Sequence, residues 1–389
     1  MTARPQSVFP NQLPTYAERE RVLLAPYAMH SVDSKGRRYF ETEHRYRGPF
    51  QRDRDRILHS AAFRRLSGKM QVFTGEMGDY HRTRLTHTYE VASIARTIGR
   101  TLRLNEDLIE ALALFHDIGH PPFGHAGEDT LHACLEGYGG FSHNRHALTI
   151  AEELEVRYHA FPGLNLTSEV LEGQFERTAK QSNSAAPLLE VQLVDAADSI
   201  TYDAHDVDDA LKLGLVQIAE LKQVPLLREI VHDVQQEHTC LSADHLRMAL
   251  VHGLIDRQVR NVLAYCGHKL KELAFENATI ARQSPFRIGP DKELAGQKSE
   301  LETFLYEYVY RHRKLMEIRH TAKTKLGATF TFYIDHHDQL PPRYQKRAES
   351  IGLHRSVGEY LAGMTDRFLE KQFSQMQSRG GEENGVYEG

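Results

Sequence analysis

The chain has 389 residues, of which 40% are hydrophobic, and a formal net charge of −5 at pH 7. This length exceeds the usual size of one compact core, so we expect two lobes or one elongated fold. The negative charge argues against a generally basic nucleic-acid-binding protein, and three widely spaced cysteines argue against a disulfide framework or a cysteine-based zinc site.

The N-terminal residues 1–50 are polar and contain scattered Tyr and Arg, which predicts an extended arm with one short helix near residues 16–24. Such an arm either packs on a neighbouring subunit or frays. The N-terminus lacks the apolar core of a signal peptide, and the chain contains no apolar run of the roughly 18 residues that span a membrane. We therefore expect a soluble, cytoplasmic protein with no membrane contact.

The next predicted elements are a helix over residues 53–66, a loop over 67–79 around a strand-like stretch at 70–73, and a helix over 83–102. Apolar residues recur at helical spacing along the inward face of the last helix, and His87 lies on that face. A lone inward histidine is usually a hydrogen-bonded core residue. It becomes a candidate metal ligand only where further ligands are available.

The chain is organised around residues 114–129, LFHDIGHPPFGHAGED. Asn105 caps a strongly apolar helix over Glu106–Phe115, which has acids in its first turn and delivers the doublet His116–Asp117. A helix dipole that merely favours histidine would explain one such residue, not three beside two carboxylates. Imidazole and carboxylate groups bind metals and carry protons, so this stretch predicts a metal site with acid–base chemistry. Its further candidate groups are His120, His125 and Glu128.

Residues 188–212 form a long predicted helix whose acids are its main interest. Asp198, Tyr202 and Asp206 follow one another at four-residue intervals, which places all three on one stripe. An acidic surface stripe is the alternative interpretation. Apolar residues flank these acids, however, so the helix is not simply solvated.

Helical patterns dominate the rest of the chain, and almost no strand pattern is present, which predicts an all-α fold. A mobile loop is expected at 281–296. The remaining predicted helices lie at 168–178, 217–234, 242–273, 298–326, 328–337 and 356–373.

His87, the His116–Asp117 doublet and Asp198 form a set of two imidazoles and two carboxylates. Mixed nitrogen and oxygen ligands suit Mn, Mg, Fe, Co or Zn and argue against a copper–thiolate or iron–sulfur site. The order H…HD…D, with all four residues on helices, is more specific than the residue types alone.

With this set the sequence resembles the HD-domain metallohydrolases, and within them the deoxyguanosinetriphosphate triphosphohydrolase family, the dNTPases. The resembling stretches occur in order over roughly 300 residues, which makes an accidental match untenable. They are FRRL at 63–66, QVF at 71–73, RTRLTHTYEV at 82–91, HDIGHPPFGHAGE at 116–128, GGFSHN at 139–144, DSITYDAHD at 198–206, LPPRY at 340–344 and YLAGMTDR at 360–367.

The resemblance implies an all-α fold, a divalent metal ion and hydrolysis of dGTP or several dNTPs to deoxynucleoside and inorganic triphosphate. It divides the chain into an arm at 1–50, an HD catalytic core at 51–215, a helical C-terminal part at 216–377 and a disordered tail at 378–389. Matched by motif, the metal ligands are His87, His116, Asp117 and Asp198, the catalytic residues are His125, Glu128 and His143, and the substrate-binding residues are Arg84, Tyr202, Asp206 and Gln71.

One position departs from the family pattern. After the Leu-Glu-Gly of 171–173, many members have a lysine followed by histidine or an aromatic residue, whereas this chain has Glu176–Arg177. The change is expected to weaken phosphate binding or shift substrate preference, unless Arg177 or Lys180 takes over.

Two alternatives remain open at this stage. The H…HD…D set fits another HD phosphohydrolase, a 5′-nucleotidase or phosphodiesterase, equally well. A non-catalytic regulator is the other alternative, in which basic clusters at 52–69 and 311–325 bind an allosteric dNTP or single-stranded DNA; solvated helix faces explain those residues as simply. The family resemblance also implies a homo-oligomer, a tetramer or a hexamer.

Overall fold

The computed structural model describes residues 14–44, 46–71, 82–178, 186–237 and 241–384. Within these ranges the secondary structure is helical apart from two isolated β-bridges, so the prediction of an all-α fold is confirmed. The α-helices are α1 (Tyr16–Leu23), α2 (Pro49–Leu58), α3 (Ala61–Arg65), α4 (Arg84–Thr101), α5 (Glu106–Phe115), α6 (Gly124–Cys134), α7 (His143–Thr149), α8 (Ser168–Thr178), α9 (Leu189–Lys212), α10 (Ile218–Leu221), α11 (Pro225–Glu237), α12 (Ala243–Leu273), α13 (Ala278–Gln283), α14 (Lys292–Phe304), α15 (Arg313–Asp335), α16 (Pro342–Ile351), α17 (Leu353–Ala362) and α18 (Asp366–Asn384).

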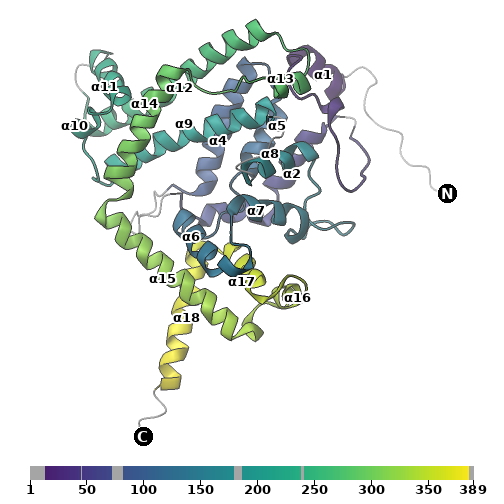
Figure 1. Cartoon of the computed structure of the whole chain (residues 1–389), viewed down its shortest axis with the longest axis vertical. Helices are drawn as coiled ribbons and strands as arrows, with labels where there is room; N and C mark the ends of the chain where they lie inside the picture. Colours follow the sequence, from purple (N-terminus) through teal and green to yellow (C-terminus); the bar gives the residue numbers. More distant parts are fainter. Residues whose placement is uncertain (1–13, 45, 72–81, 179–185, 238–240, 385–389) are drawn as a thin grey trace, which may run out of the picture.

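The main core forms where α4 packs against α5 and α9, and α2 packs against α5 (Figure 1). Its helices begin and end where the local sequence dictates. The Asn105 side chain accepts a hydrogen bond from the N–H of Leu108 at the start of α5, and Thr83 and Thr86 form a capping box at the start of α4. α5 is apolar on nearly all sides, so it is buried along most of its length and carries His116 into the interior.

Helices α15 to α18 lie together below this core in the view of Figure 1. Leu131 of α6 is buried in one apolar cluster with Leu326 of α15 and Leu361 of α17. A further apolar cluster joins the end of α9 to α11, α12 and α14. α6 follows the His116–Asp117 stretch in the chain, so the packing of α15 and α17 on α6 helps to hold that stretch in position.

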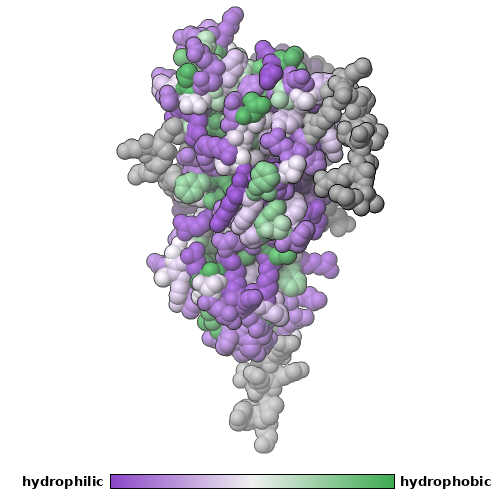
Figure 2. Space-filling view, turned by 90° about the vertical axis from the view of Figure 1, so that its right-hand side faces the viewer, coloured by the Kyte–Doolittle hydropathy of each residue, from purple (hydrophilic) through white to green (hydrophobic). Residues whose placement is uncertain are grey.

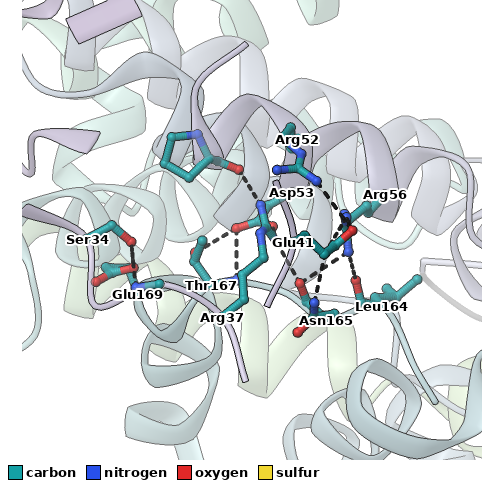
Figure 3. Close-up of polar contacts among 12 residues, drawn as sticks. Ser34, Arg37, Glu41, Arg52, Asp53, Arg56, Leu164, Asn165, Thr167 and Glu169 are labelled. Carbon is teal, nitrogen blue, oxygen red and sulfur yellow. Dashed lines mark hydrogen bonds and ion pairs between the residues drawn. The ribbon is translucent and has the colours of Figure 1, made fainter. Parts of the chain in front are cut away.

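The described part of the predicted N-terminal arm packs on its own chain, and its short helix is α1. Ala28 and Met29 are buried in the main core. Arg37 forms an ion pair with the fully buried Asp53 of α2, which also accepts hydrogen bonds from the backbone N–H (3.0 Å) and the hydroxyl (2.6 Å) of Thr167 (Figure 3). A buried carboxylate needs such partners, so they anchor this segment to the core.

The single helix predicted over 53–66 was wrong, because the chain breaks after α2. The Ser60 hydroxyl accepts a hydrogen bond from the N–H of Phe63 and so caps the start of a separate helix, α3. The carboxylate of Glu155 accepts a hydrogen bond from the N–H of Ala61 (2.7 Å). Of the strand-like stretch at 70–73, Met70 forms an isolated bridge with Thr83, and residues 72–73 lie outside the described residues.

Several C-terminal predictions also need correction. The helix predicted over 217–234 is divided into α10 and α11, because Pro225 lacks an N–H and begins a new helix. The loop predicted at 281–296 contains the end of α13 and the start of α14, which Asp291 caps. The helices predicted over 298–326 and 328–337 are replaced by α14, a π-helical turn at Leu305–Tyr310, and one continuous α15.

The last predicted helix, over 356–373, is divided between α17 and α18, which are separated by residues 363–365. Residues 378–384 of the predicted disordered tail are helical and belong to α18, whereas 385–389 lie outside the described residues. Hydrophilic side chains cover most of the face in Figure 2, where apolar side chains lie in small separate groups. None of the described helices combines the length and apolar character needed to cross a membrane.

Candidate metal centre and active site

Three helices bring the first ligand set together. α4 contributes His87, the end of α5 contributes His116 and Asp117, and α9 contributes Asp198. Ligand atoms of His87, His116 and Asp117 lie within 4.8 Å of one another. The Oδ1 atom of Asp198 lies 3.0 Å from Nε2 of His87 and 3.7 Å from Nε2 of His116. The four groups therefore surround one small volume.

The orientation of His116 indicates what this volume needs. Its Nδ1 atom lies 2.6 Å from the carbonyl oxygen of Ala113, so Nδ1 carries the hydrogen and donates it. Nε2 then presents a lone pair, is buried, and has no hydrogen-bond partner among the described residues. The nearest acidic atoms are Oδ1 of Asp117 at 3.5 Å and Oδ1 of Asp198 at 3.7 Å. A lone pair facing two carboxylate oxygens is repulsive unless a cation lies between them.

The charges around this volume favour a metal ion over a proton. Burial lowers the pKa of His116, so its ring is neutral near pH 7. Burial alone would raise the pKa of Asp117, but nearby His116, Arg84 and His120 hold it well below the ordinary value. The pKa of Asp198 is lowered in the same way by His116 and His87, against the effect of burial. Neutral imidazoles beside ionised carboxylates are the ligand forms that a divalent metal requires, so the residues fit such an ion.

Arg84 lies against the same centre. Its side chain is almost completely buried, and its Nη1 atom donates a hydrogen bond to Oδ2 of Asp117 (2.8 Å). Its Nε atom has no hydrogen-bond partner among the described residues. A Cβ on Gly124, which has φ +56°, would lie 3.0 Å from Nη2 of Arg84. Glycine therefore lets the α5–α6 loop approach a guanidinium that could also bind an anion.

A second polar cluster lies beside the first. Nδ1 of His143 lies 2.8 Å from Oε1 of Glu128, and the ring of His143 stacks on that of His120 with centroids 3.8 Å apart. Nε2 of His120 lies 3.2 Å from Oδ1 of Asp117, which joins the two clusters. The absence of a side chain at Gly119 lets the backbone there pack against the backbone at His143, because a Cβ on Gly119 would lie 2.0 Å from the carbonyl oxygen of His143.

The predicted pairing of His125 with Glu128 is looser than expected. Nδ1 of His125 lies 3.7 Å from Oε2 of Glu128, beyond hydrogen-bond distance, and 60% of the His125 side chain is exposed. Glu128 instead accepts hydrogen bonds from the backbone N–H and the ring of His143. Burial would raise the pKa of Glu128, but hydrogen bonds and the charges of neighbouring histidines hold it far below its ordinary value. Glu128 is thus an ionised acceptor between two histidines.

The stripe on α9 faces a tyrosine that the sequence did not single out. The hydroxyl of Tyr310, in the π-helical turn, donates a hydrogen bond to Asp206, and the rings of Tyr202 and Tyr310 stack with centroids 6.5 Å apart. Burial raises the pKa of Asp206 to about 8. Gln71 is buried near Gly124, and its Oε1 atom has no hydrogen-bond partner among the described residues.

The departure at Glu176–Arg177 still leaves a cation near the centre. Arg177 donates a hydrogen bond from Nε to Asp195 (2.8 Å). Burial is the largest cause of the lowered pKa of His116; nearby acids oppose the lowering, and the charge of Arg177 adds to it. Lys180 lies outside the described residues. Arg177 is therefore a positive charge near His116, where the family resemblance led us to expect a lysine.

Comparison with known proteins agrees with this geometry. A family model described as HD domain matches residues 84–203, and one described as Phosphohydrolase-associated domain matches residues 288–375. A Nitrosomonas europaea protein named "Deoxyguanosinetriphosphate triphosphohydrolase-like protein" is 39% identical over 365 residues, covering 91% of this chain and 97% of that protein. The chain belongs to the HD-domain deoxyguanosinetriphosphate triphosphohydrolase family.

Other members of this family carry the same name. A Leptospira interrogans protein is 37% identical over 371 residues, covering 92% of this chain and 97% of its own. A Geobacter metallireducens protein is 38% identical over 369 residues, covering 92% and 96% respectively. A solved structure of a hypothetical Aquifex aeolicus protein has a TM-score of 0.32 at 17% identity over 68% of this chain and 69% of that chain, a likeness that carries no argument. As a member of the HD family, the chain is a phosphohydrolase with a candidate metal site.

Both polar clusters lie within the HD-domain match. The phosphohydrolase-associated match contains further residues of the site region that sequence reasoning missed. Tyr310 is one, and Asp366 is another. Asp366 accepts hydrogen bonds from the N–H of Phe123 (3.0 Å) and of Met70 (2.9 Å), and so holds the α5–α6 loop. Both lie more than 100 residues from their partners, so no local pattern could have indicated these contacts, although Asp366 belongs to the YLAGMTDR stretch. His120, three residues after Asp117, is a candidate group in the sequence, and the structure places it between Asp117 and His143.

Proposed function

We propose that this chain is a metal-dependent dNTP triphosphohydrolase, which converts dGTP or several dNTPs to deoxynucleoside and inorganic triphosphate. The observation that carries the proposal is the unpartnered Nε2 lone pair of His116, which faces the carboxylates of Asp117 and Asp198. The names of the relatives, which cover nearly the whole chain, support a nucleotide triphosphate as substrate.

His87, His116, Asp117 and Asp198 would hold the metal, which we expect to be Mn, Mg, Fe, Co or Zn. When bound, the ion would supply neutralisation of phosphate charge and polarisation of a water molecule. Arg84, fixed by Asp117, would orient the phosphate chain through charge-assisted hydrogen bonds. Arg177 would add a second positive charge near the same phosphates.

Cleavage at the α-phosphorus forms a bond from phosphorus to a water oxygen and breaks the bond to the 5′-oxygen of the sugar. That oxygen is a poor leaving group unless it gains a proton as it departs. We assign this proton transfer to His125, whose exposed ring can reach a substrate. Glu128 is the carboxylate that would accept a hydrogen bond from the His125 ring if the two approached more closely than 3.7 Å. His143, hydrogen-bonded to Glu128, would keep that carboxylate in place.

Preference for a deoxy sugar would come from the α9 stripe. Tyr202 lies one helical turn from Asp198, so its ring could exclude a 2′-hydroxyl, and Asp206 would line the sugar and phosphate pocket with Gln71. Tyr310 packs against this wall. Equal kcat/KM for GTP and dGTP would remove this role of Tyr202.

The test incubates purified protein with Mn²⁺ or Mg²⁺ and each of the four dNTPs, alone and in mixtures, and identifies products by chromatography. We expect deoxynucleoside and inorganic triphosphate, and no turnover by an Asp117→Ala variant. Orthophosphate as the product in place of triphosphate would instead indicate another HD phosphohydrolase. Salt-dependent binding of single-stranded DNA without turnover under any metal would indicate a regulator.

Faster turnover in mixtures than with single dNTPs would indicate an allosteric dNTP site. Sedimentation would test the expected tetramer or hexamer.

A further inference from the structure

A second buried imidazole lies directly behind His87. Nδ1 of His205, on α9, is 3.3 Å from Nδ1 of His87, on the side of the ring opposite Asp198, and the two ring centroids are 5.3 Å apart. His205 is 2% exposed and His87 is 1% exposed, so the contact excludes water. Within the described residues, neither Nδ1 atom makes another hydrogen bond.

The far side of His205 faces a carboxylate. Its Nε2 atom lies 2.5 Å from Oε2 of Glu90, which follows His87 by three residues on α4. His205 likewise follows Asp198 by seven residues on α9. Three and seven residues are both spacings that return to one face of a helix. Two packed helices thus align Glu90, His205 and His87 in one row that ends at Nε2 of His87, 3.0 Å from Asp198.

The position of each hydrogen in this row follows from the contacts. A carboxylate accepts, so Nε2 of His205 carries a hydrogen and donates it to Glu90. A neutral His205 then has a lone pair on Nδ1, which can only accept. Nδ1 of His87 must therefore carry the hydrogen of that ring, and Nε2 of His87 is left with the lone pair. This is the tautomer that can bind a metal ion on the side of Asp198.

We propose that Glu90 and His205 are positioning residues, which fix the tautomer and ring orientation of His87 for metal binding. The inference rests on the proposed function only in that His87 is taken as a metal ligand. Without the row, the buried His87 ring could place its hydrogen on Nε2, toward Asp198, and would then be unable to bind a metal. His116 obtains the same orientation from a backbone carbonyl, whereas His87 depends on two side chains.

The test measures Mn²⁺ affinity by electron paramagnetic resonance and His87 tautomer by ¹⁵N NMR of metal-free protein, so neither readout needs substrate. Glu90→Ala is expected to weaken Mn²⁺ binding by roughly tenfold to a hundredfold and to shift the His87 signals away from a single Nδ1–H tautomer. Glu90→Gln, whose amide oxygen still accepts from His205, is expected to restore most of the affinity. Glu106→Ala, which removes a carboxylate paired with Arg100 away from this row, is the matched control and should bind Mn²⁺ as the unmodified protein does.

A further variant, alone and combined with Glu90→Ala, distinguishes the proposed positioning of His87 from a general loss of folding. In His205→Asn, the shorter side chain can still accept from Nδ1 of His87 but does not reach Glu90. Adding Glu90→Ala to this variant should therefore change the Mn²⁺ affinity no further, whereas independent structural roles would give additive losses. Unchanged Mn²⁺ affinity and tautomer in folded Glu90→Ala, or additive losses in the double variant, would overturn the inference. Absence of Mn²⁺ binding by the unmodified protein would instead overturn the proposed metal site itself.

Discussion

Replacement of Asp198 by asparagine gives the most direct test of the metal centre. The substitution keeps the shape of the side chain and removes one of the two carboxylates that face the His116 lone pair. Because nearby histidines hold the pKa of Asp198 below its ordinary value despite burial, the group is ionised near neutral pH. The variant therefore loses a full negative charge at the position where a cation is expected.

The size of the effect follows from binding linkage. A ligand present at 100 times its Kd stabilises the folded state by about 2.7 kcal/mol, and one present at its Kd by about 0.4 kcal/mol. If the loss of Asp198 weakens Mn²⁺ binding by about a hundredfold, the stabilisation by Mn²⁺ falls by about 2.3 kcal/mol. For a chain of 389 residues that corresponds to a loss of roughly 3 °C in the Mn²⁺-induced rise of Tm.

The assay is thermal unfolding followed by circular dichroism, with and without Mn²⁺ at a fixed concentration near 100 times the Kd of the unmodified protein. Asp208→Asn is the control, because it removes a carboxylate of the same helix that is paired with Arg82 and Arg247. We expect the control to keep the Mn²⁺-induced rise in Tm. An equal rise in Asp198→Asn and in the unmodified protein would refute the assignment of Asp198 as a ligand.

Three further predictions concern catalysis, pH and stability. His125→Ala should lower kcat by roughly 10²- to 10⁴-fold with Mn²⁺ affinity unchanged, and unchanged turnover would remove His125 from the mechanism. Because burial raises the pKa of Asp206 to about 8, the unfolded chain loses this proton at lower pH than the folded one. The group's contribution to stability is therefore present below about pH 4 and is lost toward pH 8, at about 1.4 kcal/mol per pH unit. Asp206→Asn should flatten that slope in urea unfolding between pH 5 and 8, and an identical slope would contradict it. Asp53→Ala leaves the guanidinium of Arg37 with backbone carbonyl acceptors but no carboxylate. It should lower the free energy of unfolding by about 3–5 kcal/mol, and a loss below about 1 kcal/mol would show that the ion pair does not anchor the N-terminal segment.

Helices with clear local signals were predictable from the sequence. Asn105 before an apolar run located the start of α5, and the apolar periodicity after Thr83 located α4. Where a helix is interrupted by a cap or a proline inside a helical pattern, prediction failed. Ser60 and Pro225 both begin new helices in regions that periodicity alone had joined. The hydrophobic period continues across such breaks, so only the cap or proline marks them.

The candidate ligands could also be named from the sequence, because His116 and Asp117 are adjacent, His87 lies on the apolar face of a predicted helix, and apolar residues flank Asp198. Their mutual distances depend on how α4, α5 and α9 pack. The roles of His143 and His125 toward Glu128 could not be read from the sequence. His125 lies three residues before Glu128 on α6, and His143 begins α7, 15 residues after Glu128. Of the two, His143, whose ring stacks on His120, forms the hydrogen bond with Glu128.

By itself, the sequence determined the fold class, the starts of several helices such as α4 and α5, and the residue types that can bind a metal, since these depend on neighbours a few residues apart. Only the tertiary structure decided which nitrogen of His116 is left without a proton, which carboxylates face it, and that Glu90 reaches His87 through His205. These features depend on ångström-scale distances between residues up to 118 positions apart, as for His87 and His205. Helix packing sets such distances, and a hydrogen bond or a ligand bond tolerates only small departures from them.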